Sequence, residues 1–214
     1  MEYKKKGANK YNFNKGTLLK FPINEYLNKI NKNNEAINEI KLLAKIEKED
    51  INKNIYFLDN TEGNYFDDGE YHHYNLKELN KLNTEIFINN LKYKYTKSFK
   101  PEKEGLYRIK IKFNNIIKDC RFMFYNCHNL TNIDLSSFDT KNVNNMGYMF
   151  YNCHNLTNID LSSFDTKNAN NMGYMFYKCS NLIKINLSSF DTKNVNNMDF
   201  MFYECSNLTV IVFF

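Results

Sequence analysis

The chain has 214 residues and a formal net charge of +5 at pH 7. No apolar run approaches the roughly 18 residues of a membrane-spanning helix, so we expect no membrane span. The charge is unevenly placed, because residues 1–36 hold eight Lys and three Glu and the remainder is close to neutral. We therefore expect anionic-surface or nucleic-acid binding only from this first segment, and the rest of the chain argues against nucleic acid as a partner.

Residues 1–36 show little hydrophobic periodicity and predict a basic, largely disordered tail. Within it, Pro22 introduces Ile23, Leu27 and Ile30, whose spacing predicts one short amphipathic helix. The opening MEYKKK is similar to the charged start of a signal peptide, but no apolar core follows it. On that ground we expect a cytoplasmic protein.

Residues 37–103 predict a β-rich cap, either a small antiparallel sheet or a sandwich. Apolar and polar residues alternate over residues 40–46 and again over 106–113, which is the spacing of a strand with one buried face. Two apolar runs flank the pair Asn89 and Asn90. These two residues tolerate the positive φ of a two-residue turn, so the segment predicts a β-hairpin.

The second half of the chain repeats itself with a period of 26 residues. Two copies that differ at one position and a third copy with seven changes are followed by a partial one, and a degenerate copy precedes them. The copies cover residues 104–122 (degenerate), 123–148, 149–174, 175–200 and 201–214 (partial). A fixed period of roughly 20–50 residues is typical of stacked repeat architectures, so residues 104–214 predict one repeat domain.

Each copy has two halves with different hydrophobic spacing. In the first half, Ile133 and Leu135 alternate with polar residues, which predicts a short strand. The second half places apolar residues at the i, i+3, i+4 and i+7 spacing of a helix face, with an Asn pair suited to an N-cap before them. These apolar residues are Met146, Met149, Phe150 and Cys153. One copy cannot cover its own apolar face, so we expect the copies to stack.

The phrase NLTNIDLSSFDTKNVNNMGYMFYNC closely resembles the BspA-like leucine-rich repeats of bacterial and protist surface proteins. The resemblance covers about half of the chain and extends over the whole repeated phrase. It implies a leucine-rich-repeat-like, right-handed solenoid of short parallel strands and short helices, with the β-rich cap at its N-terminal end. It also implies protein binding or adhesion without catalytic residues, and a cell-surface location as the alternative to the cytoplasm.

The cysteines and histidines offer a metal site as an alternative. The chain has five cysteines, an odd number, and four of them recur with the repeat period, which favours buried thiols over disulfides. His128 and His154 directly follow Cys127 and Cys153 and invite a zinc site. Neighbouring residues point in different directions, however, and Ser replaces His in the later copies. We therefore predict no zinc, no other cofactor and no enzyme activity.

Acidic residues raise a second question of metal binding. Asp134 and Asp160 should lie one strand apart, where two carboxylates could hold Ca²⁺ or form a solvated ladder, and Asn186 ends the column. The sequence leaves this choice open. Residues 66–73 also carry metal-capable side chains, but they lack the spacing of a known metal motif and predict a polar loop.

We expect the exposed face of the stacked strands to bind a protein partner, because stacked repeats present extended surfaces. The predicted face, called the polar face below, consists of Thr131, Asn132, Asp134, Ser136, Thr157, Asn158, Asp160, Ser162, Lys184, Asn186 and Ser188. The alternative is anionic-surface or nucleic-acid binding through the Lys-rich tail. A metal-dependent enzyme is a third and weaker hypothesis.

The last copy departs from the polar pattern of the others. Val210 and Val212 stand where the first copy has Asn132 and Asp134, and Phe214 stands where it has a serine. The final strand is therefore apolar on both faces. An unpaired apolar strand is a template for another chain, so we predict self-association through residues 208–214.

Overall fold

A computed structural model of the chain describes residues 37–61 and 76–213, which belong to one compact unit. The predicted tail over residues 1–36, with its short helix, lies outside the described residues. The predicted polar loop over residues 66–73 and the edge residue Phe214 also lie outside them.

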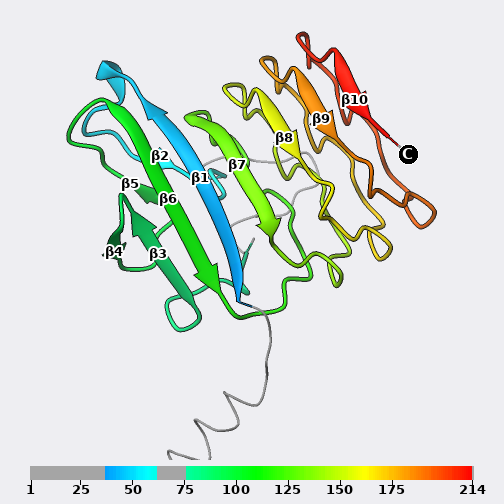
Figure 1. Ribbon diagram of the computed structural model, residues 1–214, viewed down its shortest axis with the longest axis horizontal. Coiled ribbons are helices and arrows are strands. Elements are labelled where there is room, and N and C mark those ends of the chain that lie inside the picture. The colour runs from blue at the N-terminus through cyan, green and yellow to red at the C-terminus, as the bar shows by residue number, and fades with distance from the viewer. Residues whose placement is uncertain (1–36, 62–75, 214) are drawn as a thin grey trace, which may run out of the picture. The chain divides into compact units, whose positions relative to one another are not determined.

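The largest sheet has five strands in the order β4-β3-β6-β1-β7, and every neighbouring pair is antiparallel (Figure 1). Its strands are β1 Asn38–Ile46, β3 Thr84–Ile88, β4 Leu91–Tyr93, β6 Gly105–Phe113 and β7 Leu130–Ser137. Buried and exposed residues alternate along β1 and along the second half of β6, as the sequence predicts. Asn89 and Asn90 join β3 to β4 with φ values of 49° and 69°, so the predicted hairpin is confirmed.

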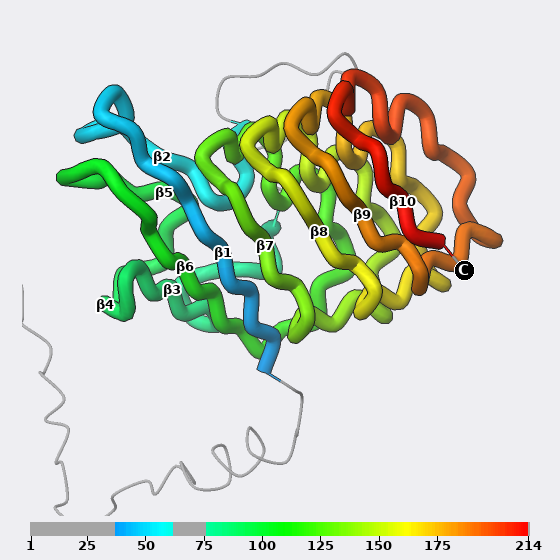
Figure 2. The backbone as a smooth tube through the Cα atoms, turned by 45° about the horizontal axis from the view of Figure 1, so that its top comes forward, coloured from blue at the N-terminus to red at the C-terminus, as the bar shows by residue number. Residues whose placement is uncertain are grey.

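Three shorter strands form a separate parallel sheet in the order β10-β9-β8, and each comes from a different copy. They are β8 Asn158–Asp160, β9 Lys184–Asn186 and β10 Val210–Val212. β8 lies beside β7, so β1, β7, β8, β9 and β10 follow one another in space (Figure 2). The remaining elements are the paired strands β2 Ile55–Tyr56 and β5 Ser98–Phe99, and the 3-10 helix η1 Lys48–Asp50.

The predicted fold class, a leucine-rich-repeat-like right-handed solenoid of short parallel strands and short helices, is wrong. The fold is β-rich, and its main sheet is antiparallel. Within residues 37–61 and 76–213, η1 is the only helical element, and it has three residues. No helix in this part of the chain is long and apolar enough to cross a membrane.

A chain of tight turns stands in place of each predicted helix. Tyr148 and Asn152 have φ values of 58° and 57°, a left-handed conformation that ends any right-handed helix. From Tyr148 to Cys153, every second backbone N–H closes a local turn, and the N–H groups between them donate to the next copy. Phe150 N–H, for example, donates to the Met175 carbonyl at 2.9 Å. The apolar residues thus have the spacing of a helix face, but their backbone is not helical. Half of its N–H groups donate to the next copy instead.

Equivalent residues of successive copies stack on one another, and we call each such set a column. The phenyl rings of one buried column are parallel, with centroid distances of 5.4, 5.0 and 5.6 Å. This column consists of Phe124, Phe150, Phe176 and Phe202. Met, Cys, Leu and Ile columns are buried beside it through the middle copies. Burial of this apolar surface is the main force that holds the copies together.

Polar residues also join the copies. The buried Thr166 hydroxyl donates to the Asp191 carbonyl at 3.1 Å and accepts from the Asp191 N–H at 2.8 Å. Thr140 makes the same two bonds to Asp165 one copy earlier. Each bond satisfies a backbone group that would otherwise be unpaired, so these threonines lock the copies in register.

Glycine occurs where one copy closely approaches the next. A Cβ on Gly173 would lie 2.8 Å from the Asn197 side-chain oxygen, and one on Gly147 would lie 3.2 Å from the Asn171 side chain. Neither position therefore leaves room for a Cβ without a shift of the facing Asn side chain.

The first edge of the copies is covered by β1. Residues of the predicted degenerate copy do continue the stack at one corner, where Asp119 bridges to Asn145 and Cys120 N–H donates to the Asn145 carbonyl. The strand of the degenerate copy is β6, and it does not continue the stack, because it pairs with β1 and β3. β1 lies between β6 and β7 and runs antiparallel to β7. A segment far away in the sequence thus takes the position expected for a repeat strand.

Candidate functional site

The polar face lies over β7, β8 and β9, where strand alternation separates it from the core. Ile133, Ile159 and Ile185 point inward and are buried, while their neighbours along each strand point outward. Thr131 differs from the other members, because its hydroxyl donates to the Leu43 carbonyl of β1 at 3.1 Å. That bond holds Thr131 partly buried at the junction with the cap.

The structure brings most of the polar face together around one hollow of about 660 Å³. Its polar lining includes Asn132, Asp134, Ser136, Asn158, Asp160, Ser162, Lys184 and Asn186. Thr131, Thr157 and Ser188 do not line it. Side chains of three successive copies therefore meet at one surface, at the strand spacing of about 4.8 Å. The first two copies present the same Asn and Asp, and the third presents Lys184 and Asn186 in their places.

The acidic residues of the polar face are held by local hydrogen bonds. The Asp134 carboxylate accepts from the Ser136 hydroxyl at 2.6 Å and from its N–H at 3.0 Å. Asp160 accepts from the Ser162 N–H at 2.9 Å. These bonds lower the pKa of both carboxyl groups, so both are ionised at neutral pH. The hydrogen bonds also fix the direction of each side chain.

The second oxygen of Asp134 lies 3.3 Å from the Lys41 ammonium of β1. This contact competes with any cation that would bridge Asp134 and Asp160. Among the described residues, no group of three or more His, Cys, Asp and Glu side chains could hold a metal ion. The geometry therefore favours the solvated ladder over a calcium site.

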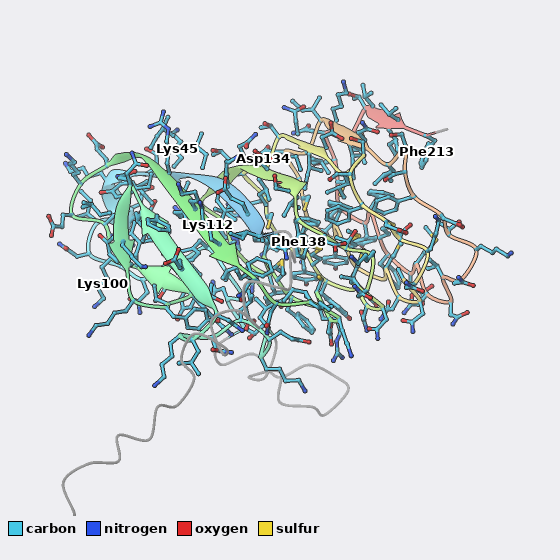
Figure 3. The ribbon with its side chains drawn as sticks, turned by 60° about the horizontal axis from the view of Figure 1, so that its bottom comes forward. Lys45, Lys100, Lys112, Asp134, Phe138 and Phe213 are labelled. Carbon is cyan, nitrogen blue, oxygen red and sulfur yellow. The ribbon has the colours of Figure 1, made fainter. Side chains whose placement is uncertain are left out.

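The polar face continues onto the cap, where its charge changes sign. β1 and β6 carry Lys41, Arg108, Lys110 and Lys112 on the side that adjoins Asp134. Figure 3 labels Lys112 of β6 and Asp134 of β7. The alternation in RIKIKF places the three β6 cations on one side, so the sequence did carry this signal. It carried no signal that β1 would pair with β7, and that pairing joins the basic surface to the polar face.

The Cys and His residues, which the sequence argues against as zinc ligands, form no metal site among the described residues. His128 and His154 stack with centroids 4.7 Å apart, and His128 Nδ1 lies 2.9 Å from the Asn152 carbonyl. The Cys153 thiol instead donates to the Phe124 carbonyl at 3.0 Å in the core. Burial raises the pKa of the Cys127 and Cys153 thiols well above the usual value, which disfavours the thiolate that a metal would need.

The stacked histidines predict a dependence of stability on pH. Burial, followed by the neighbouring His128, lowers the pKa of His154 below its ordinary value of 6.5. The unfolded chain then binds the proton more readily, so stability is lost as the pH falls below 6.5 through the lower folded pKa. We expect the melting temperature to fall between about pH 7 and pH 5, and to fall less in His154→Ser.

Thermal unfolding of the wild type and of His154→Ser at three pH values measures this difference. Ser is the matched replacement, because Ser180 and Ser206 hold this position in the later copies. Carboxyl groups with lowered pKa, such as Asp134, contribute only at lower pH and do not obscure the comparison. Equal pH slopes in the two proteins would contradict the prediction.

Comparison with known proteins gives one family match. Residues 106–211 match the model of a family described as "Mycoplasma protein of unknown function, DUF285". The matched region runs from β6 to β10 and includes the whole polar face. No curated protein and no solved structure matches the chain. The resemblance to BspA-like repeats and the implied adhesion stay predictions.

Proposed function

We propose that this chain is a non-enzymatic protein-binding module whose recognition surface is the polar face. The observation that carries the proposal is the hollow over β7, β8 and β9, which is lined by polar side chains from three copies. Stacked columns and bonds between copies lie directly behind it. A rigid backbone reduces the entropy lost on binding, which favours recognition.

The chemistry of the hollow suits a protein partner. Asn132 and Asn158 present side-chain amides, which both donate and accept hydrogen bonds and can therefore pair with a peptide backbone. Asp134 and Asp160 add acceptors, and Lys184 adds a cation at the next strand. A segment lying across the strands would meet the same Asn and Asp at the first two copies and Lys184 with Asn186 at the third.

The experiment replaces the charged residues of the polar face together, as Asp134→Asn, Asp160→Asn and Lys184→Gln. Asn keeps the oxygen that accepts from the following Ser, so the local turn should persist. We expect affinity for the partner captured from a cell lysate to fall at least tenfold, with little change in melting temperature. Unchanged affinity would place the binding site elsewhere.

A charge-matched control is available at the corner of the copies, as Asp139→Asn, Asp165→Asn and Lys193→Gln. There the Asp139 carboxylate pairs with Lys141 at 3.0 Å, away from the hollow. We expect this control to bind like the wild type. Binding through the Lys-rich tail, the alternative function, would instead weaken steeply with added salt in all three proteins.

The chain should also self-associate through the edge of β10. β10 pairs with β9 on one side, and no other strand in the described part of the chain pairs with it. Val210 is 42% exposed and Phe213 is 63% exposed, so the edge carries accessible apolar surface. We expect concentration-dependent association by light scattering, and a monomer after Val210→Asn with Val212→Asp. A monomeric wild type at high concentration would contradict this prediction.

A further inference from the structure

A second hollow, of about 390 Å³, adjoins the polar face on the exposed side of β3, β6 and β1. We call it the basic hollow. Its lining includes Lys41, Phe87, Asn90, Arg108, Lys110 and Asn132. Asn132 and Asp134 line both hollows, so the two form one continuous surface across the junction of cap and copies.

The register of the sheet places cations against one another in the basic hollow. Lys110 of β6 lies directly opposite Lys41 of β1, and on its other side it lies opposite Phe87 of β3. Arg108, two residues earlier on the same side of β6, lies opposite Leu43. Like charges directly opposite each other destabilise an antiparallel pair. The sheet therefore carries an unfavourable arrangement at this position.

Carboxylates lie close to Lys112 and Lys41 on this surface, but not to Arg108 and Lys110. Lys112 lies opposite both Glu39 and Glu85, and its ammonium is 3.2 Å from the Glu39 carboxylate. Lys41 is 3.3 Å from Asp134 and 3.5 Å from Glu39. Three cations (Lys41, Arg108, Lys110) and two carboxylates (Glu39, Asp134) line the basic hollow, so its net charge is +1. Arg108 and Lys110 are its cations without a carboxylate at ion-pair distance among the described residues.

Aromatic and apolar groups surround these charges. The Lys110 ammonium lies 5.1 Å from the centroid of the Phe87 ring, which attracts it as a cation–π contact. Phe87 and Leu43 are partly buried and line the floor beside it. Attraction between opposite charges is stronger beside apolar surface than in open water. A guanidinium such as that of Arg108 also binds a carboxylate with two parallel hydrogen bonds.

We propose that the basic hollow binds the carboxylate side chains of an acidic segment of the protein partner. This proposal rests on the proposed function and names the chemistry of one end of the partner. The segment that crosses the polar face continues over β7 and β1, where Asn132 and Asn90 bond its backbone. Arg108 and Lys110 then neutralise its acidic side chains.

Nuclear magnetic resonance of the full chain tests the proposal with a defined probe, an acetylated peptide of six glutamates. We expect saturable shifts of the Arg108 Nε–H signal and of the Asn90 and Asn132 side-chain amide signals. The corresponding peptide of six glutamines should leave them unmoved. Because the signals belong to individual residues, binding of the probe to the Lys-rich tail does not affect the result.

Arg108→Gln with Lys110→Gln should weaken the affinity measured at Asn132 at least tenfold. Lys141→Gln with Lys193→Gln removes the same charge at the corner of the copies and should change it less than twofold. Unmoved signals in the wild type, or equal affinities in the two double variants, would overturn the proposal. Inorganic phosphate that binds at these residues as tightly as the glutamate peptide would overturn it too. The hollow would then bind any anion and not carboxylate side chains in particular.

The two proposals can fail separately. If the polar-face variant loses the natural partner while Arg108→Gln with Lys110→Gln keeps it at full affinity, the proposed function stands and the acidic segment is excluded. If the glutamate peptide binds as expected and the polar-face variant keeps the partner, the basic hollow is an anion site and the polar face is not the recognition surface.

Discussion

Phe150→Ala will lower the free energy of unfolding by about 3–5 kcal/mol, because it removes a fully buried ring from the middle of a column. The Phe150 ring is 0% exposed and stacks on Phe124 and Phe176 at 5.4 and 5.0 Å. Ala would leave a cavity between two copies, and both neighbouring rings would lose contacts. Chemical denaturation followed by circular dichroism measures the change.

Phe202→Ala is the matched control for this variant. Phe202 holds the same position in the last copy and is only partly buried, with one stacked neighbour, Phe176. We expect it to cost less than half as much as Phe150→Ala. Equal costs for the two variants would mean that the column does not stack as described.

Thr166→Val should lower the free energy of unfolding by about 1–3 kcal/mol, although Val has nearly the same shape as Thr. The Thr166 hydroxyl bonds both the carbonyl and the N–H of Asp191, and its side chain is fully buried. Val removes both bonds and leaves two backbone groups without their partner. Asp191 is an exposed residue, so the net value of an ordinary hydrogen bond applies, roughly 0.5–1.5 kcal/mol for each bond lost.

Thr192→Val tests whether this cost comes from the bonds between copies. Thr192 holds the same position one copy later and is exposed. We expect Thr192→Val to change stability by less than about 0.5 kcal/mol, which is typical of surface substitutions. A similar loss in both variants would show that Thr166 acts through local packing and not through its bonds to Asp191.

Local sequence spacing predicted the strands but not their partners. Alternation in residues 40–46 and 106–113 located β1 and β6, and Asn89-Asn90 located the hairpin. The pairing of β1 with β7 joins residues that are about 90 positions apart, such as Leu42 and Ile133. No local pattern encodes such a contact, so the cover of the first repeat edge could not be predicted.

The helix prediction failed because the same spacing of apolar residues is compatible with a helix and with a series of tight turns. Met146, Met149 and Phe150 face the core equally well from a helix or from successive turns. The difference lies in the backbone N–H groups, half of which donate to the next copy. Left-handed residues at Tyr148 and Asn152 allow this. Asn favours that conformation, but Tyr does not, so the turn at Tyr148 has no clear sign in the sequence.

The polar face was accessible to sequence reasoning, and its extension onto the cap was not. Repetition with period 26 placed Asp134 beside Asp160 and Asn132 beside Asn158, as the hollow requires. The basic hollow needs β1 next to both β6 and β7, a neighbourhood set by tertiary pairing. From the sequence, the residues of the basic hollow could be recognised only as the polar side of a predicted strand.

The most direct test of the proposed function is a photo-crosslink from the polar face. A benzophenone amino acid placed at Asn158, an exposed residue that lines the hollow, should give one discrete adduct with a protein in a cell lysate. The same group at Lys193, exposed at the corner of the copies, should give none. An adduct from Lys193 alone, the same adduct from both positions, or no adduct from Asn158 would contradict recognition by the polar face.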